Sequence, residues 1–300
     1  MIKGLGFLIA CIGLAPLSAA QQGGIEVFAA ETLFAQGTRL SLTTIYESRS
    51  DLYSGSSEIA DPLNQSLLRR TTVLGVDHGF LPHVTLSALI PFKDNSFESV
   101  VGDMDGAGLG DAAVLAKYRV HETLWPRGGF RVAVLGGAEL PTGDTNERSG
   151  GMRLAPSLQP GSGSVDPFLA LSTNYDQGRF RVDALAFYKD NTEGDQDFED
   201  GDFFALEVDF AYRFYYTKYP GQTASAKLGL QWRDVGRSQQ AGVTVADTGY
   251  EQLMLRTGLS WHPRPDLDVS LAVDLPLEQD YVGEQLGLDY RSLLAVGIRF

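Results

Sequence analysis

The sequence predicts an all-β fold: a transmembrane, antiparallel up-and-down β-barrel of about 12 strands. Three observations lead to this class. Strand-like segments of about ten residues recur along the chain, long and short connections alternate between them, and the chain ends on an amphipathic strand. After the amino terminus no stretch is long and apolar enough for a transmembrane helix, although 43% of the residues are hydrophobic. The pattern rather than the composition therefore decides the class.

The amino terminus has the layout of a secretory signal peptide. Lys3 supplies a positive charge, residues 4–15 are apolar, and small residues follow up to Ala20. The apolar run is too short to cross a bilayer as a helix, which needs about 20 residues. We expect residues 1–20 to be removed after Ala20. The alternative is lipidation of Cys11, the only cysteine, although it lies inside the apolar run.

A lead-in segment, residues 21–36, precedes the expected barrel, residues 37–300. Alternation of apolar and polar side chains marks the strands; in residues 203–215, for example, Phe204 faces one side and Glu207 the other. The expected strands are residues 38–47, 67–78, 83–92, 111–121, 129–140, 166–175, 179–188, 203–215, 223–233, 250–262, 268–276 and 290–300.

The connections between these strands alternate strictly in length. The short ones are residues 79–82, 123–128, 176–178, 217–222 and 263–267, and the long ones are residues 48–66, 93–110, 141–165, 189–202, 234–249 and 277–289. An up-and-down membrane barrel produces this asymmetry, with tight periplasmic turns and long outer loops. A soluble β-sandwich has no reason to sort its loops in this way.

The last strand, residues 290–300, has an apolar face that includes Phe300, and Arg291 and Arg299 lie on the opposite face. We expect it to pair with residues 38–47 and so close the barrel, with both arginines directed into the lumen. A final strand that ends on an aromatic residue resembles that of bacterial outer-membrane barrels, where the barrel assembly machinery commonly reads it. We therefore expect a bacterial outer-membrane location and an assembly role for Phe300.

The same register turns charged side chains of both signs toward the interior. On the lipid face a Lys or Arg near the bilayer midplane would cost about 2–4 kcal/mol. The expected lumen-lining residues are Lys117, Arg119, Arg131, Glu139, Arg181, Asp183, Glu207, Asp209, Arg213, Lys227, Arg233, Arg256, Asp268 and Asp274. They suit a polar pathway that selects solutes by charge. The alternative is a salt-bridged, filled lumen, because barrels of this size lie between filled small barrels and open porins.

The chain is acidic, with 38 Asp and Glu residues, 24 Lys and Arg residues and a net charge of −14. Such a balance disfavours nucleic-acid binding, which needs a basic face to neutralise phosphates. The loop of residues 189–202 is rich in carboxylates, which are ligands for calcium or magnesium. Divalent cations are thus possible partners of this loop, and a solvated acidic loop is the alternative.

No enzymatic signature is present. Ser162 lies in a glycine–serine run that is not the strand-to-helix nucleophile elbow. The four histidines have no metal-ligand spacing and lie at expected strand ends: His78, His83, His121 and His262. The sequence therefore predicts neither an enzyme nor a bound cofactor, catalytic residue or metal ligand.

Three short motifs resemble one known family. A glycine–aspartate opening precedes a strand, a Pro-Thr-Gly turn follows the next strand, and a Gly-Ser-Gly loop comes after it. The residues that carry them are Gly108, Gly110, Asp111, Pro141, Thr142, Gly143, Gly161 and Gly163. Their order and spacing resemble the outer-membrane family of the MetA pathway of phenol degradation. Val165 departs from the pattern, because an aromatic residue is expected there.

The resemblance implies a barrel and the uptake of small hydrophobic or aromatic molecules. We therefore predict an outer-membrane channel or transporter whose partners are the membrane lipid and a small solute. The alternative is a structural or surface-interaction barrel with acidic, cation-binding loops. The glycines would allow tight turns, and Asp111 would cap the turn before its strand.

Overall fold

Alternating side chains give the chain its strands, and the alternation is the reverse of that in a soluble protein. In β13 (Phe203–Tyr216), Leu206, Val208 and Phe210 are exposed, whereas Glu207 and Asp209 are buried. An apolar outside and a polar inside fit a barrel that has lipid around it. Among the described residues, no helix is long and apolar enough to cross a membrane.

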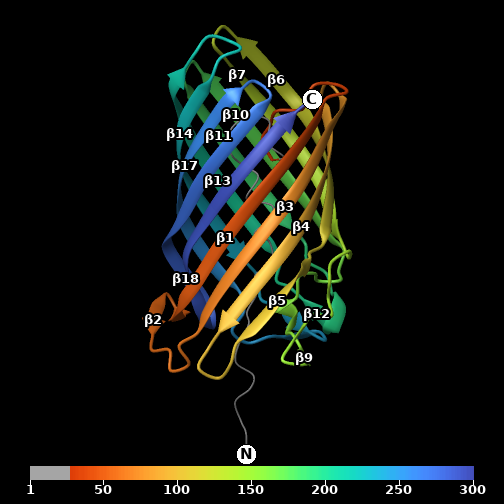
Figure 1. Cartoon of the computed structure of the whole chain (residues 1–300), viewed down its shortest axis with the longest axis vertical. Helices are drawn as coiled ribbons and strands as arrows, with labels where there is room; N and C mark the ends of the chain where they lie inside the picture. Colours follow the sequence, from red (N-terminus) through yellow and green to blue (C-terminus); the bar gives the residue numbers. More distant parts are fainter. Residues whose placement is uncertain (1–27) are drawn as a thin grey trace, which may run out of the picture.

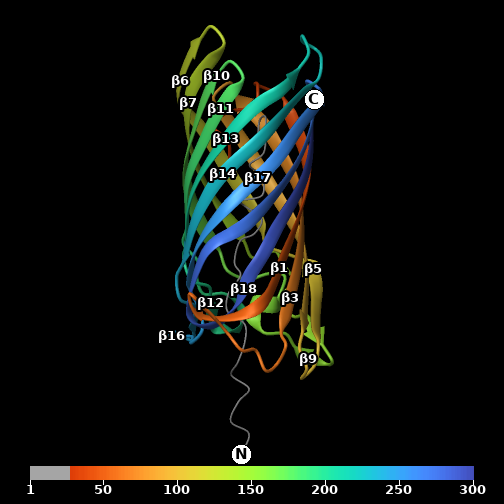
Figure 2. The ribbon, with the colours of Figure 1, turned by 90° about the vertical axis from the view of Figure 1, so that its left-hand side faces the viewer.

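The computed structural model describes residues 28–300, which form a closed barrel (Figure 1, Figure 2). The predicted signal peptide, residues 1–20, lies outside the described residues. Eleven long antiparallel strands make the wall: β1 (Thr38–Gly55), β3 (Ser66–Leu81), β4 (Val84–Glu98), β6 (Ala112–Trp125), β7 (Gly128–Leu140), β10 (Asp166–Gln177), β11 (Phe180–Lys189), β13, β14 (Thr223–Val235), β17 (Tyr250–Arg264) and β18 (Leu267–Arg299).

The strand β18 crosses the wall twice. Residues 267–281 pair with β17, and residues 281–299 pair with β1. Gly283 lies between these two arms with a φ of +79°, a conformation that glycine adopts without strain. Counted as two arms, β18 completes the predicted barrel of about 12 strands.

The first and last strands close the barrel in the predicted register. Arg39 pairs with Arg299, and Ser48 pairs with Tyr290. The Phe300 N–H donates to the carbonyl oxygen of Thr38 at 2.8 Å. The pairing leaves no open sheet edge along this seam, as a membrane barrel requires.

The two rims differ as the loop lengths predict. Short turns such as that between β6 and β7 lie at the rim that also holds the carboxyl terminus, which we call the short-turn rim (Figure 1). The opposite rim, called the outer rim, carries the short strands β2 (Ser57–Ile59), β5 (Met104–Leu109), β8 (Arg148–Ser149), β9 (Met152–Arg153), β12 (Phe198–Glu199), β15 (Gln239–Gln240) and β16 (Val243–Thr244). Two 3-10 turns, η2 (Pro156–Leu158) and η3 (Asp195–Asp197), also belong to these outer connections.

Three of the predicted long connections are wrong in part. Residues 277–289 belong to β18, β1 continues to Gly55 and pairs with β2, and β4 continues to Glu98 and pairs with β5. In these places hairpin pairing satisfies the backbone hydrogen bonds, so polar residues that resemble a loop remain in strands.

Candidate functional site

The side chains that the sequence predicts to line the lumen are all buried or half-buried. The buried ones are Lys117, Glu207, Asp209, Lys227, Arg233, Arg256, Asp268 and Asp274. The half-buried ones are Arg119, Arg131, Glu139, Arg181, Asp183 and Arg213. Arg291 is fully buried as well, whereas Arg299 is half-buried beside the short-turn rim.

A buried ion-pair cluster centres on Asp274. Arg256 donates to both of its carboxylate oxygens, at 2.7 and 3.0 Å, and Arg291 donates to the same carboxylate through Nε at 2.8 Å. Arg291 also reaches the amide oxygen of Gln231 at 3.0 Å. Two guanidinium groups thus share one carboxylate, which lets several charges remain buried in a narrow interior.

A second polar layer lies toward the outer rim. Lys189 Nζ donates to Glu139 Oε2 at 3.0 Å and lies 3.6 Å from Asp166 Oδ2. On the other side of the barrel, Arg49 Nε donates to Glu47 Oε1 at 2.9 Å. These pairs place charges of both signs near the outer end of the interior.

Aromatic side chains form a belt inside the barrel near these charges. The aromatic belt consists of Phe168, Phe187, Phe203, Tyr250 and Tyr281, all buried. The Phe187 ring lies 5.6 Å from that of Phe168 and 5.9 Å from that of Phe203, and the two tyrosine rings lie 5.8 Å apart. Such spacings are those of attractive ring pairs. The interior therefore contains an apolar zone that the list of charged residues does not include.

The alternation in the sequence predicts part of this belt, although a search limited to charged residues does not find it. Phe187 lies on the same face of β11 as Arg181, Asp183 and Lys189, because its position in the alternation is the same. Once Arg181 is assigned to the lumen, parity places Phe187 there too. The contacts among β10, β11 and β13, in contrast, depend on the tertiary structure.

The described part of the lead-in segment, residues 28–36, begins inside the barrel at Phe28, reaches the short-turn rim and is held to the wall. The Glu31 carboxylate accepts hydrogen bonds from Arg181 at 2.5 and 2.9 Å, and Lys117 Nζ donates to the Glu31 carbonyl oxygen. The Leu33 N–H donates to Thr85 Oγ1 at 2.9 Å. Two of the predicted lumen-lining residues therefore bind this segment.

The three sequence motifs meet at one place, which we call the motif junction. Asp111 Oδ1 accepts from the N–H of Gly143, and its Oδ2 accepts from the N–H and hydroxyl of Ser162. A Cβ on Gly143 would lie 2.7 Å from backbone atoms of Gly110 and Gly161, so this close approach requires glycine. Thr142 Oγ1 accepts from the N–H of Ala112 at 2.8 Å.

The other motif glycines also lie in tight places. A Cβ on Gly108 would meet Asp144 and Pro160, and Gly163 has a φ of +77°. Pro141 follows the end of β7 and is exposed. The hydroxyl of Ser162 is engaged with Asp111 and lies 2.7 Å from the hydroxyl of Ser164, which gives it a structural set of partners.

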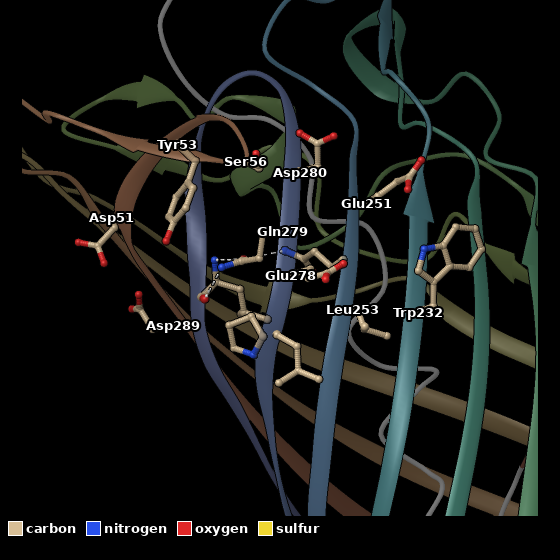
Figure 3. Close-up of a pocket in the computed structure, with 14 residues that line it drawn as sticks. Asp51, Tyr53, Ser56, Trp232, Glu251, Leu253, Glu278, Gln279, Asp280 and Asp289 are labelled. Carbon is tan, nitrogen blue, oxygen red and sulfur yellow. Dashed lines mark hydrogen bonds between the residues drawn. The ribbon is translucent and has the colours of Figure 1, made fainter.

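A pocket of about 660 Å³ lies near the outer rim beside the hairpin of β18 (Figure 3). No Lys or Arg is among the lining residues of this pocket. Five carboxylates line it: Asp51, Glu251, Glu278, Asp280 and Asp289. Trp232 and Leu253 add apolar surface. At its floor the Gln279 amide bonds both the N–H and the carbonyl oxygen of Leu288, at 2.8 and 3.1 Å.

A second pocket, of about 260 Å³, lies at the short-turn rim and has the opposite charge. Its lining includes Arg181, Arg213, Lys227 and Arg264, and neither Asp nor Glu. The acidic pocket thus lies on the outward face of the wall near the outer rim, and the basic pocket lies at the short-turn rim. This polarity biases which charged solutes approach each end.

The acidic loop of residues 189–202 uses several of its carboxylates within the protein. Asp195 accepts from Arg153 at 2.5 Å, and a hydrogen bond with Thr145, together with those from Gln196 and Arg153, lowers the pKa of Asp195. Burial raises the pKa of Asp200. Within residues 28–300 no group of three His, Cys, Asp or Glu side chains is arranged to hold a metal ion.

The solved structures that share the fold include two with a TM-score of at least 0.50. An outer membrane channel from Pseudomonas putida F1, described as a COG4313 channel, superposes with a TM-score of 0.68 at 16% sequence identity, covering 92% of this chain and 100% of that one. The β domain of the Bordetella autotransporter BrkA gives a TM-score of 0.50 at 9% identity, covering 88% and 100%. No curated protein sequence matches the chain.

The sequence itself matches a family profile over residues 64–291, which includes the motif junction and most of the barrel wall. The match covers more than half of the chain, and the closed barrel places the protein in the bacterial outer membrane. The chain belongs to the family described as "Putative MetA-pathway of phenol degradation".

Proposed function

We propose that this protein is an outer-membrane channel through which small hydrophobic or aromatic solutes pass. The observation that carries the proposal is the aromatic belt inside the barrel, whose rings lie among charged side chains such as Lys189 and Arg49. A barrel whose interior serves only to satisfy charged side chains has no need of five buried aromatic rings. The apolar surface of these rings gives a hydrophobic solute a favourable position on its way across.

The size and the relatives of the barrel support a channel. About 12 strands enclose more space than the filled eight-stranded barrels, although less than the open porins. The Pseudomonas putida F1 protein with the same fold is an outer membrane channel. The family to which this chain belongs is described by a pathway of phenol degradation, which fits an aromatic solute.

Electrostatics narrow the class of solute further. The outer pocket, on the outward face of the wall near the outer rim, is lined by five carboxylates and by no basic side chain, so its negative charge disfavours anions that approach this rim. Neutral solutes meet no such barrier, and their rings match the belt. We therefore infer that neutral, single-ring aromatic compounds are preferred over aromatic carboxylates.

The experiment that tests the proposal measures uptake by intact cells. A Gram-negative host with an unbroken lipopolysaccharide leaflet, which slows hydrophobic solutes, would be given a radiolabelled neutral aromatic at low concentration, with and without the full chain. We expect faster uptake with the protein, and a smaller gain for the matching aromatic carboxylate. Uptake that is the same with and without a correctly inserted barrel would refute the proposal.

A further inference from the structure

One aromatic ring in the interior belongs to no strand. Phe28 lies at the start of the described chain, inside the barrel, and its side chain is 0% exposed. Its ring meets that of Phe187 edge to face, with centroids 5.8 Å apart and an interplanar angle of 81°. This is a preferred arrangement for an aromatic pair.

The wall around Phe187 has the shape of a recess for a ring. Its direct cross-strand neighbours are Ala170 on β10 and Ala205 on β13, two small residues on the inner face. One row further out, Phe168 and Phe203 flank Lys189 in the same way. Successive inner rows lie about 7 Å apart, so the alanines leave space beneath the two outer rings.

The attachment of the segment leaves Phe28 free to move without unfolding the barrel. The carboxylate of Glu31 binds Arg181, the Leu33 N–H donates to Thr85, and the Gln36 N–H donates to the carbonyl oxygen of Gly79. These anchors all begin three residues beyond Phe28. The ring can therefore leave the recess while residues 31–36 stay bound to the wall.

We propose that the recess formed by Ala170, Phe187 and Ala205 is a binding site for a single neutral aromatic ring, and that Phe28 occupies it as a tethered substitute for the solute. This recess would define the solute class of the channel as neutral single-ring aromatics, and the inference rests on the proposed function. A solute that enters displaces Phe28, and the segment returns when the solute leaves. The apparent affinity of the recess for a solute is thereby multiplied by the fraction of time that Phe28 leaves the recess empty.

The chain is well suited to a direct test by cysteine labelling. Cys11 is the only cysteine and lies in the predicted signal peptide, so a cysteine introduced at Ala205 provides a unique thiol in the recess. The Ala205→Cys protein would be compared with two further variants, Ala205→Cys with Phe28→Ala and Ala205→Cys with Phe34→Ala. Phe34 is the matched control, because it lies in the same segment but is 54% exposed.

Modification by a small charged methanethiosulfonate is the readout, with folding of each variant checked by heat-modifiable migration on gels. We expect the thiol at position 205 to react roughly tenfold faster in the protein that also carries Phe28→Ala than in the Ala205→Cys protein alone or in the one with Phe34→Ala. The reason is that a buried ring no longer covers the thiol. In the Phe28→Ala variant, benzyl alcohol should slow the reaction several-fold more than cyclohexylmethanol, since only the former makes a ring–ring contact.

The outcomes separate this inference from the proposed function. Equal reaction rates in all three variants, or equal protection by the two alcohols, would overturn the recess as an aromatic site even if cells take up the solute. Selective protection by benzyl alcohol without any uptake by cells would support the recess and count against the channel.

Discussion

Asp111 Oδ1 accepts a hydrogen bond from the Gly143 N–H at 2.9 Å, and this contact joins two sequence motifs that lie a strand pair apart. The second carboxylate oxygen holds Ser162 of the third motif. One side chain therefore fixes to each other the two outer connections that flank the β6–β7 hairpin. The motifs that identify the family lie at a structural junction beside the lumen, rather than at a chemical site.

The first prediction concerns this junction. Asp111→Ala removes three charge-assisted hydrogen bonds, and we expect it to lower the free energy of unfolding by about 2–4 kcal/mol. Urea unfolding of the refolded barrel measures the change. Asp103→Ala, at an exposed position in a neighbouring outer connection, is the control and should change stability by less than about 0.5 kcal/mol. Equal effects of the two substitutions would contradict the role of the junction.

The second prediction concerns the buried ion pairs around Asp274. Asp274→Asn leaves Arg256 and Arg291 without their shared carboxylate, and we expect a loss of about 3–5 kcal/mol in unfolding free energy. Asp266→Asn removes an exposed ion pair with Arg264 and should cost about 1 kcal/mol or less. A loss at Asp274 no larger than that at Asp266 would show that the central cluster contributes little to stability.

The third prediction is a dependence of stability on pH. Burial raises the pKa of Asp200 above its ordinary value, and its Oδ1 is buried without a hydrogen bond. The unfolded chain therefore releases this proton at a lower pH than the folded chain does, so stability falls as pH rises from the ordinary pKa through the raised one. Asp200→Asn should be more stable than the wild-type protein at pH 7, and the gap should close in acid. Urea midpoints of the two proteins, measured across pH, check this prediction. A difference between the midpoints that stays constant with pH would contradict a contribution of the Asp200 carboxylate to stability.

The fourth prediction concerns Phe300, for which we propose the assembly role expected from its terminal position. Its backbone is paired with Thr38 at the seam, and its side chain is exposed at the short-turn rim. Deletion of Phe300 should reduce the amount of folded barrel in the outer membrane several-fold, while the conductance of each barrel that does insert stays unchanged. Quantification of heat-modifiable protein in membrane fractions measures the first effect, and planar-bilayer recording measures the second. Normal insertion of the chain that lacks Phe300 would contradict the proposed assembly role.

The fold could be predicted because lipid outside and a polar lumen inside impose alternation on every strand. The pairing of residues 290–300 with residues 38–47 was predicted, and the exact partners, such as Arg39 with Arg299, come from the structure. The ends of the strands could not be predicted as well. Glu278 and Asp280 resemble loop residues, and they belong to β18 because they pair with β17. Local sequence does not contain that pairing.

The site could be predicted only for its charges. Parity placed Arg256 and Asp274 in the interior, but their shared ion pair with Arg291 depends on the order of strands around the barrel. Residues 28–36 have no period that would predict a position inside the lumen. The contact of Phe28 with Phe187 joins segments far apart in the sequence, and only the tertiary structure brings them together.

The most direct measurement of the central claim, our fifth prediction, compares two phenylalanines of β11 in the cell-uptake experiment. Phe187 belongs to the aromatic belt, whereas Phe180 is 63% exposed at the short-turn end of the same strand. At equal amounts of folded barrel, Phe187→Ser should reduce uptake of a neutral aromatic solute roughly tenfold, because it replaces an apolar surface with a polar one. Phe180→Ser should leave uptake near the wild-type rate. Equal uptake by the two variants would contradict a pathway through the aromatic belt.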